Sequence, residues 1–281
     1  MCMTWDPMSI DELAAFQRSS GARVVKTRGT WWVEARPFFF RPLFPFSAVS
    51  PDPGNYPARS RVGGVLHLVP AGASGNSCMN LFLYDEIGDY SLGEMGSKAR
   101  WIIKKSLENF RAARITDLNS FTQEAYTVYR SFYGRTRYFY KSERTDKESF
   151  GSWAKTLFQN PKTVVMGAYH QERLCAVDVS YQVEDIIIDD IFFSDTASQQ
   201  LRVTDFLLHT LREGAKSSDA RYIFRGFPSG KESLDQSKVT RGCKLLQLPA
   251  YCRINPLALC LGKATMGASY RKLVAMTSCH P

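Results

Sequence analysis

The fold is decided by the stretch TVVMGAYHQERLCAVDVSYQVEDIIIDDIFF, which runs from Thr163 to Phe193. Residues that favour β structure gather here in three runs, and the short turn His170-Gln-Glu172 separates the first two. Runs of this length with such short connections predict strands over Thr163–Tyr169, Arg173–Val183 and Ile186–Phe193. The stretch therefore predicts an antiparallel three-stranded meander.

After the meander, helices and strands alternate. Residues 203–216 place four apolar side chains on one helical face, which predicts a helix. It precedes a strand over Arg221–Arg225, a polar helix over Lys231–Arg241 and a strand over Leu245–Ile254. The order β-β-β-α-β-α-β predicts an α/β protein, of the α+β type with a mixed sheet. Ligands collect where such a sheet changes its connections, so we expect the cleft between the Ile186–Phe193 strand and the Arg221–Arg225 strand.

This order resembles the GNAT fold of acyl-CoA N-acyltransferases, and residues 234–256 resemble its FemAB-like branch. In that branch a helix with an fK…G pattern precedes a strand with a Y-x-R-x-N-P ending. The residues at those places are Lys238, Gly242, Tyr251, Arg253, Asn255 and Pro256. The resemblance begins at about Arg111. It implies a GNAT-like acyltransferase domain over residues 111–281, and a degenerate N-terminal copy of the same unit over residues 1–110.

The N-terminal part itself predicts mixed α/β structure. Residues 22–26 and 30–35 read as a hairpin. Residues 36–57 contain six prolines, which cannot donate to a ladder, so an edge strand or a loop is expected there and not a central strand. Further strands are expected over Val62–Val69 and Cys78–Tyr84.

The middle of the chain predicts three helices and one strand. The helices are expected over Ser97–Ala113, from a capping box at Ser120 to about Tyr133, and over Ser149–Phe158. The strand is expected over Ala112–Asp117. The resemblance implies that the connection between the last two helices overhangs the substrate site. Arg135 and Arg137 in that connection are therefore candidates to bind an acidic group of the substrate, and a solvated loop is the alternative.

The formal net charge of +9 is unevenly distributed. Between Lys98 and Lys147 there are twelve Lys/Arg residues and five Asp/Glu residues. Aromatic residues are interleaved with them: Tyr126, Tyr129, Phe132, Tyr133, Tyr138, Phe139 and Tyr140. This pattern could bind the backbone and bases of a nucleic acid, or it could be an amphipathic helix pair with its rings inward. A phosphate-bearing ligand such as CoA or tRNA suits both readings.

Composition limits the class of protein and its compartment. The apolar runs are too short for a membrane span, and residues 1–16 lack the pattern of a signal peptide. Seven cysteines without a CxxC pair predict reduced thiols and a cytoplasmic location. Zinc-ligand spacings, GxSxG, the P-loop and GxGxxG are all absent from the sequence, so we expect no metal and no tightly bound cofactor.

The resemblance implies a donor site in the turn after the third strand of the meander. GNAT enzymes carry a Q/R-x-x-G-x-G/A turn there, whose amide groups bind a pyrophosphate. Gln199 takes the first place, but Arg202 and Thr204 stand where glycines are expected. Side chains there crowd a phosphate cradle, although Arg202 could supply charge instead. Because Fem-type proteins use aminoacyl-tRNA and lack a strict glycine loop, this departure favours that branch.

Asp189 and Asp190 are candidates for proton transfer. They lie within an apolar strand, where neighbouring side chains face opposite sides, so one carboxylate should face the core or the cleft. Such an acid could accept a proton from an amine nucleophile. The alternative is that one pairs with a basic residue and the other is solvated. Asp178 and Tyr181 on the neighbouring strand are candidate partners, with Tyr181 a candidate to contact the substrate.

Lys238 is the third candidate for catalysis, because it stands where ordinary GNAT enzymes carry a tyrosine that protonates the leaving thiolate. A cation there could bind a phosphate or stabilise an oxyanion, and a solvent-facing lysine is the alternative. Ser229 and Lys231, in the turn that enters the same helix, are weaker candidates for the donor. Arg225, at the end of the preceding strand, is a candidate for the substrate.

Together these residues predict an N-acyltransferase that transfers an acyl or aminoacyl group to an amine on a small molecule or peptide. The co-substrate implied by the resemblance is acyl-CoA or aminoacyl-tRNA, so tRNA is a candidate partner. Catalysis would consist of positioning and a proton acceptor, since the donor is already activated. The alternative is a non-catalytic GNAT-fold protein that binds nucleic acid or a protein partner through its basic face.

Overall fold

The computed structural model describes residues 3–136 and 139–279. Contacts divide the chain into two compact units that alternate along the sequence. The first unit consists of Met1–Met8 and Asp85–Phe224, and the second of Ser9–Tyr84 and Arg225–Pro281. This division differs from the boundary expected near residue 110, because the C-terminal residues join the N-terminal ones. Among the described residues, no helix has the length and apolar character needed to cross a membrane.

The first unit contains the predicted meander. Its strands are β7 (Val164–His170), β8 (Arg173–Val183) and β9 (Ile186–Ser194), each antiparallel to the next. β6 (Arg111–Arg114) adds to β7 in antiparallel fashion, and β10 (Tyr222–Phe224) adds to β9 in parallel. The strand order is therefore β10-β9-β8-β7-β6. The predicted change from hairpins to a crossover occurs between β9 and β10, and the mixed α/β class is confirmed.

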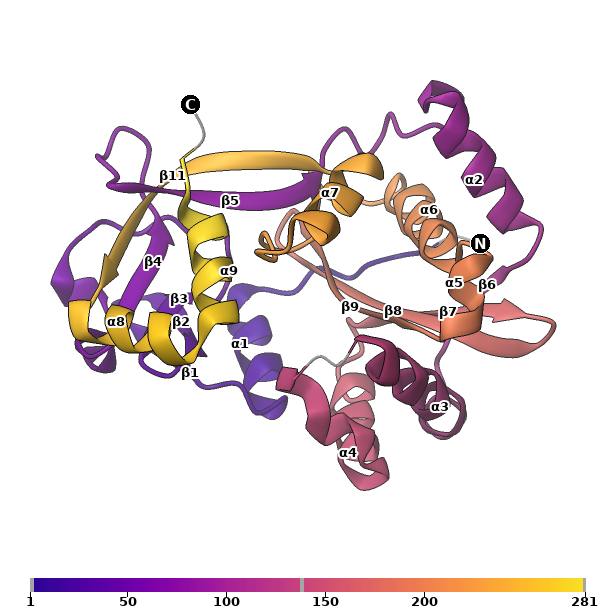
Figure 1. Ribbon diagram of the computed structural model, residues 1–281, viewed down its shortest axis with the longest axis horizontal. Coiled ribbons are helices and arrows are strands. Elements are labelled where there is room, and N and C mark those ends of the chain that lie inside the picture. The colour runs from indigo at the N-terminus through magenta and orange to yellow at the C-terminus, as the bar shows by residue number, and fades with distance from the viewer. Residues whose placement is uncertain (1–2, 137–138, 280–281) are drawn as a thin grey trace. The chain divides into compact units, whose positions relative to one another are not determined.

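Helices cover both faces of this sheet (Figure 1). α3 (Leu118–Thr136) and α4 (Lys147–Phe158) pack together, and α3 lies against β8 and β9. On the other face lies α6 (Val203–Ala215), with α2 (Ser97–Leu107) beside it and the short α5 (Thr196–Gln200) leading into it. This arrangement places the α5–α6 turn at the end of β9.

Local hydrogen bonds explain where these helices begin. α3 starts at Leu118, two residues before the expected capping box at Ser120, because the carboxylate of Asp117 accepts from the Ser120 backbone N–H at 2.8 Å. Asp146 caps α4 in the same way, accepting from the Ser149 N–H at 2.8 Å. The helix expected over residues 97–113 ends at Leu107, because β6 already begins at Arg111.

The second unit has the strand order β1-β2-β3-β4-β11-β5. These strands are β1 (Val24–Thr27), β2 (Thr30–Arg36), β3 (Phe39–Pro42), β4 (Gly64–Leu68), β5 (Ser77–Tyr84) and β11 (Lys244–Ile254). β11 is antiparallel to both of its neighbours, β4 and β5. The last strand of the chain is therefore a central strand among strands formed by the first 84 residues, which explains why the two ends of the chain share a unit.

The proline-rich segment contains a strand that was not expected. β3 pairs with β2 on one side and with β4 on the other, so the expectation of an edge strand or loop is wrong for Phe39–Pro42. The pairing with β4 involves only Phe39 and Phe40. Pro42 is the last residue of the strand and needs no donor towards β4, which is why a proline is compatible with this position. Phe40 packs in the unit's core with Trp32, Val49, Tyr56 and Val65.

The described residues of the second unit form four α-helices: α1 (Ile10–Ser19), α7 (Glu232–Thr240), α8 (Pro256–Thr265) and α9 (Gly267–Thr277). A capping box formed by Ser9 and Glu12 starts α1. Short 3₁₀ turns complete the chain, at Pro53–Asn55, Ala58–Arg61, Leu92–Glu94 and Phe139–Thr145. Of these helices only α7 was expected from the sequence, so α1, α8 and α9 are new elements.

The C-terminal end of the second unit is fixed to β5. Cys78 and Cys279 form a disulfide, and Asn80 donates to the backbone carbonyl oxygens of Ala275 and Ser278 at 2.9 and 2.8 Å. The expectation that the cysteines are all reduced is therefore wrong for this pair. The cytoplasmic location stays a prediction that has lost this support, because disulfides are rare in that compartment.

Candidate functional site

β9 carries a β-bulge and separates from β10 after three residue pairs. Only Ile186–Ile188 pair with β10, whereas β9 continues to Ser194. The register between β8 and β9 shifts so that Asp189 and Ile191 oppose adjacent residues, which makes Asp190 the extra residue of the bulge. Bulges redirect side chains and are frequent beside active sites. The cleft expected between β9 and β10 stays a prediction. The two strands pair only over the first three residues of β9.

The two candidate carboxylates on β9 have different surroundings. Asp189 is half-buried, and Asp190 is exposed. Such a difference is expected for neighbours in a strand. Tyr181 lies on β8, opposite Ile188 of β9, and is only 3% exposed. Of these three predicted residues, Asp190 is therefore the one a substrate in solution can reach most easily.

Three predicted residues come together at the end of β9, around the buried hydroxyl of Ser194. Gln199 donates from its amide nitrogen to this hydroxyl and, at 3.2 Å, to the hydroxyl of Thr204. The guanidinium of Arg135 lies 3.4 Å from the Ser194 hydroxyl and 3.2 Å from the hydroxyl of Thr196. Sequence reasoning missed Ser194. Its signal was the run Ser-Asp-Thr directly after an apolar strand, which is typical of a helix cap.

An ion pair and a capping hydrogen bond fix the start of α5 beside this cluster. Asp195 accepts from the Ser198 backbone N–H at 2.7 Å and pairs with Arg173. Burial alone would raise the pKa of Asp195, but the hydrogen bonds from Ser198 and Arg173 lower it below its usual value. Burial also lowers the pKa of Arg135.

Arg202 has the backbone conformation that a glycine would adopt. It is the N-cap residue of α6, with φ 67° and ψ 35°, in the left-handed region. Its side chain is exposed and makes no capping hydrogen bond to α6. The glycine expected at this place is therefore missing from the sequence while its backbone geometry is present.

Lys238, on α7, is partly buried. Its ammonium group donates to the carbonyl oxygens of Arg225 and Phe227, at 3.1 and 3.2 Å, and lies 4.6 Å from the centre of the Phe82 ring. Burial, and after it the positive charge of Arg225, lowers the pKa of Lys238 to about 8. The alternative of a solvent-facing lysine does not describe this residue. An amine with such a pKa can exchange a proton near neutral pH.

Ser229 and Lys231, the weaker candidates for the donor, lie in the turn before α7. The Ser229 N–H donates to both carboxylate oxygens of Asp235, at 2.8 and 3.0 Å, and the Ser229 hydroxyl accepts from the Lys231 N–H at 3.1 Å. Ser229 therefore holds the turn, while the Lys231 side chain is exposed. The Arg225 N–H donates to the Phe82 carbonyl at 2.8 Å, and the Arg225 side chain is half-buried.

Four of the aromatic residues named in the basic segment lie on α3, which packs against α4. Tyr129 is 3% exposed and packs on Phe150 and Phe193, and Phe132 contacts Tyr129 and Phe193. Tyr126 packs edge-on against Phe150. Tyr129 is therefore part of the core and cannot stack on a base, whereas Tyr126 and Phe132 are half-buried.

Two further expectations concern Arg137 and metal binding. Arg137 lies outside the described residues. In the ranges 3–136 and 139–279, no three His, Cys, Asp or Glu side chains come together as a metal site would need.

Comparisons with known proteins establish the fold. No protein-family model and no curated protein sequence matches this chain. Among solved structures, the C-terminal domain of a protein assigned as a lysylphosphatidylglycerol synthetase from Agrobacterium fabrum is similar with a TM-score of 0.62, at 13% identity over 92% of this chain and 96% of that one. FemX gives 0.58, at 9% identity over 94% and 100%. L-PGS from Bacillus licheniformis gives 0.55, at 12% identity over 95% and 97%.

These similarities cover nearly the whole chain. The chain therefore has the GNAT-like, FemAB-like fold that its sequence resembles. At such low identity they show the fold and do not assign a substrate.

Proposed function

We propose that this protein transfers an acyl or aminoacyl group from an activated donor, an acyl-CoA or an aminoacyl-tRNA, to an amine. One observation carries the proposal: Arg135, Gln199 and Thr204 gather at the end of the bulged strand β9, next to the left-handed turn that opens α6. A strand that leaves its parallel neighbour, followed by a helix N-terminus, is suited to bind an extended phosphate-bearing donor.

Each part of this region has a chemical role in the proposal. The N-terminus of α6 has a partial positive charge that favours a phosphate, and the Arg202 guanidinium adds a full charge beside it. The part of β9 that continues beyond its pairing with β10 would hold the donor's arm by backbone hydrogen bonds, with the donor's carbonyl carbon near the bulge. Arg135 donates to the backbone carbonyl of Ser194 and Gln199 to its hydroxyl, and these bonds keep the turn in place.

The reaction needs one proton acceptor. The amine nitrogen attacks the carbonyl carbon of the donor, and the tetrahedral intermediate expels the thiolate of CoA or the ribose oxygen of the tRNA. The attacking nitrogen must lose a proton, and Asp190 at the bulge is the proposed acceptor because its carboxylate is exposed beside the proposed path of the donor. The leaving group must gain a proton. Water can supply this proton. Lys238, in the second unit, is proposed separately as a residue for proton transfer, since its pKa of about 8 suits that role at neutral pH.

The two donors can be distinguished experimentally. The purified protein is incubated with radiolabelled acetyl-CoA or with charged tRNA and a panel of amines, and transfer of label to the amine is measured. Donor affinity is measured separately by titration calorimetry. Transfer from one donor that Asp190→Asn abolishes without weakening donor binding supports the proposal. Failure of both donors to bind or react, for the unmodified protein, overturns it.

The same titration tests the non-catalytic alternative. Binding of tRNA without any transfer, from charged tRNA or from CoA thioesters, would favour a binding protein. One aromatic residue of the basic segment is withdrawn from that alternative, because Tyr129 is buried against Phe150 and Phe193.

A further inference from the structure

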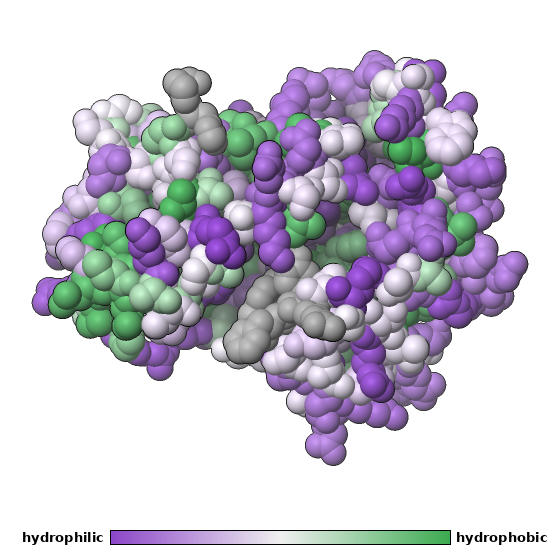
Figure 2. All heavy atoms as spheres, viewed as in Figure 1, coloured by the Kyte–Doolittle hydropathy of each residue, from purple (hydrophilic) through white to green (hydrophobic). Residues whose placement is uncertain are grey.

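The strongest feature outside the proposed donor site is an apolar surface on α8. This helix has no buried residue, although it contains Leu257, Leu259 and Leu261. Leu257 is 81% exposed and Leu261 65%, and the nearby Val62 is 55% exposed. Figure 2 shows hydrophobic residues gathered over this helix. Large exposed apolar patches mark interaction sites, whereas single exposed leucines need no explanation.

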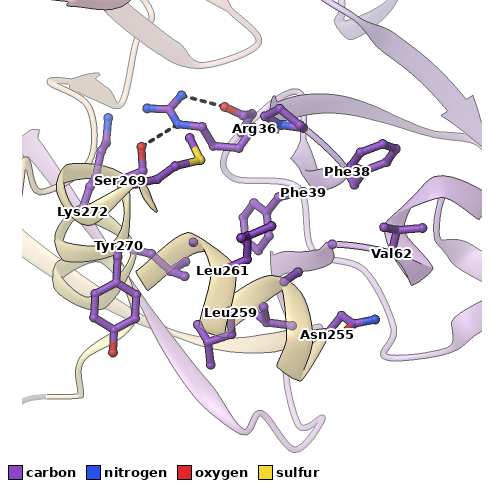
Figure 3. A pocket seen from close by; sticks show the side chains of 18 of the residues that line it. Arg36, Phe38, Phe39, Val62, Asn255, Leu259, Leu261, Ser269, Tyr270 and Lys272 are labelled. Atoms are coloured by element: carbon purple, nitrogen blue, oxygen red, sulfur yellow. Dashed lines mark hydrogen bonds between the residues drawn. The ribbon is translucent and has the colours of Figure 1, made fainter. Parts of the chain in front are cut away.

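A cavity opens among these side chains. It has a volume of about 720 Å³ and lies entirely within the second unit, between α8, α9 and the β2–β3 turn. Most of its wall is apolar, and Phe38, Phe39 and Leu273 line it together with the leucines of α8. Figure 3 shows Leu259 and Leu261 reaching it from α8, while Arg36 and Lys272 stand together towards one end. The cavity thus combines an apolar wall with a cationic end.

The cations of this region have few acidic neighbours in the sequence. Residues 253–279 contain four Lys/Arg and no Asp/Glu, and residues 35–63 contain four Arg and one Asp. Lys272, Arg36 and Arg41 line the cavity together. Burial lowers the pKa of Lys272, repulsion by the charges of Arg36 and Arg41 lowers it further, and the carboxylate of Asp235 partly offsets these effects. A bound anion would relieve this repulsion.

We propose that the α8 surface, defined as Val62, Leu257, Leu259 and Leu261 with the cavity beside them, docks on an anionic phospholipid bilayer. The leucines enter the acyl-chain boundary, an acyl chain enters the cavity, and Arg36, Arg41 and Lys272 face the phosphate of that lipid. Arg61 and Lys263, both exposed, add attraction to the membrane surface. This proposal does not depend on acyl transfer.

The length of α8 determines how it meets the membrane. Ten residues of α-helix span about 15 Å, half of the hydrocarbon thickness, so α8 can lie in the interface and cannot cross it. Leu257 and Leu261 are four residues apart and share one face, as the apolar face of an interfacial helix requires. A protein partner would not require the excess of cations, and a second copy of this chain would bring like charges together.

The test is flotation of the full chain with vesicles of phosphatidylcholine alone or of equal parts phosphatidylcholine and phosphatidylglycerol. The chain should float with the mixed vesicles and much less with the neutral ones. The double variant Leu257→Ser/Leu261→Ser should lower partitioning by about tenfold for each leucine. Arg61→Gln/Lys263→Gln should lower it by about fivefold for each charge, on the mixed vesicles only.

The matched control is Trp101→Ser/Leu107→Ser on α2, which removes two exposed apolar side chains of the first unit, 62% and 43% exposed. This variant should float like the unmodified protein. Equal partitioning of the leucine variant and the unmodified protein would overturn the proposal, as would absence of flotation with mixed vesicles. Light scattering supplies a third check: a dimer that the leucine substitutions dissociate would assign the surface to a second copy, against the proposal.

Discussion

The ammonium group of Lys238 donates a hydrogen bond to the carbonyl oxygen of Phe227 at 3.2 Å, in the turn that precedes its own helix. Together with the bond to Arg225, this contact holds a partly buried amine against backbone dipoles. Because the pKa of Lys238 is lower in the folded chain than in the unfolded one, the free energy of unfolding depends on pH.

The first prediction is a pH dependence. Lys238 has a pKa of about 8 in the folded chain and an ordinary value of 10.5. Between these values the unfolded chain binds more protons, so stability should rise with pH. From pH 8 to pH 10 the unfolding free energy should rise in the unmodified protein relative to Lys238→Met, and the difference between the two changes should exceed about 1 kcal/mol. Urea titrations over this range measure the difference, and parallel curves would show that the amine is not desolvated.

The second prediction separates backbone strain from ligand binding at Arg202. Glycine has no penalty at φ 67°, so Arg202→Gly should be about 1 kcal/mol more stable than Arg202→Ala. Both variants lack the guanidinium, so both should bind the donor more weakly, by about 1.5–3 kcal/mol. Thermal melts and titration calorimetry of the pair measure the two effects. Equal melting temperatures of the two variants would contradict backbone strain at Arg202. Donor affinity as high as in the unmodified protein would contradict a role for the guanidinium charge.

The third prediction concerns the bulge. Asp190→Asn keeps the size of the side chain and removes its basicity, so kcat for acyl transfer should fall by about a hundredfold or more. Donor affinity should stay unchanged, because the carboxylate acts on the amine. Asp189→Asn is the control, since this half-buried neighbour is not the proposed acceptor. A larger loss of kcat in Asp189→Asn than in Asp190→Asn would make Asp189 the proton acceptor and contradict the role proposed for Asp190.

The fourth prediction concerns the disulfide between Cys78 and Cys279. It closes a loop with a sequence separation of 201 residues, for which the chain-entropy model gives about 5 kcal/mol. Dithiothreitol should therefore lower the unfolding free energy of the unmodified protein, and should leave that of Cys78→Ser/Cys279→Ser unchanged. Urea denaturation with and without reductant measures the effect. An identical response of both proteins would mean that the bond does not form.

The elements of the first unit could be predicted because local signals agree there. The runs of β7, β8 and β9 have tight turns, and α6 has a clear apolar face. The polar cluster at Ser194 was only partly predictable: Gln199 and Arg135 are 64 residues apart in sequence, and only the packing of α3 beside β9 brings them together. The left-handed backbone of Arg202 could not be inferred, because arginine rarely adopts it.

The second unit was less predictable because its pairings are long-range. β11 was expected as a strand, but nothing in its residues specifies neighbours that lie more than 150 residues earlier in the chain. β3 was rejected as a central strand on its prolines, although Pro42 stands at the one end where a missing donor is harmless. The cationic end of the α8 cavity joins Arg36 and Lys272, and only the fold shows that they meet.

The central place of β11 has a consequence for biosynthesis. A ribosome releases Ser77–Tyr84 long before it reaches Lys244, and at about 5–20 residues per second the delay is roughly 8–30 seconds. During that time the edges of β4 and β5 that β11 will fill are exposed, while the strands from β6 to β10 are all complete and able to fold. The middle of the nascent chain can therefore fold before its two ends pair. In the period before β11 is synthesised, the exposed strand edges are the sites that chaperones would bind.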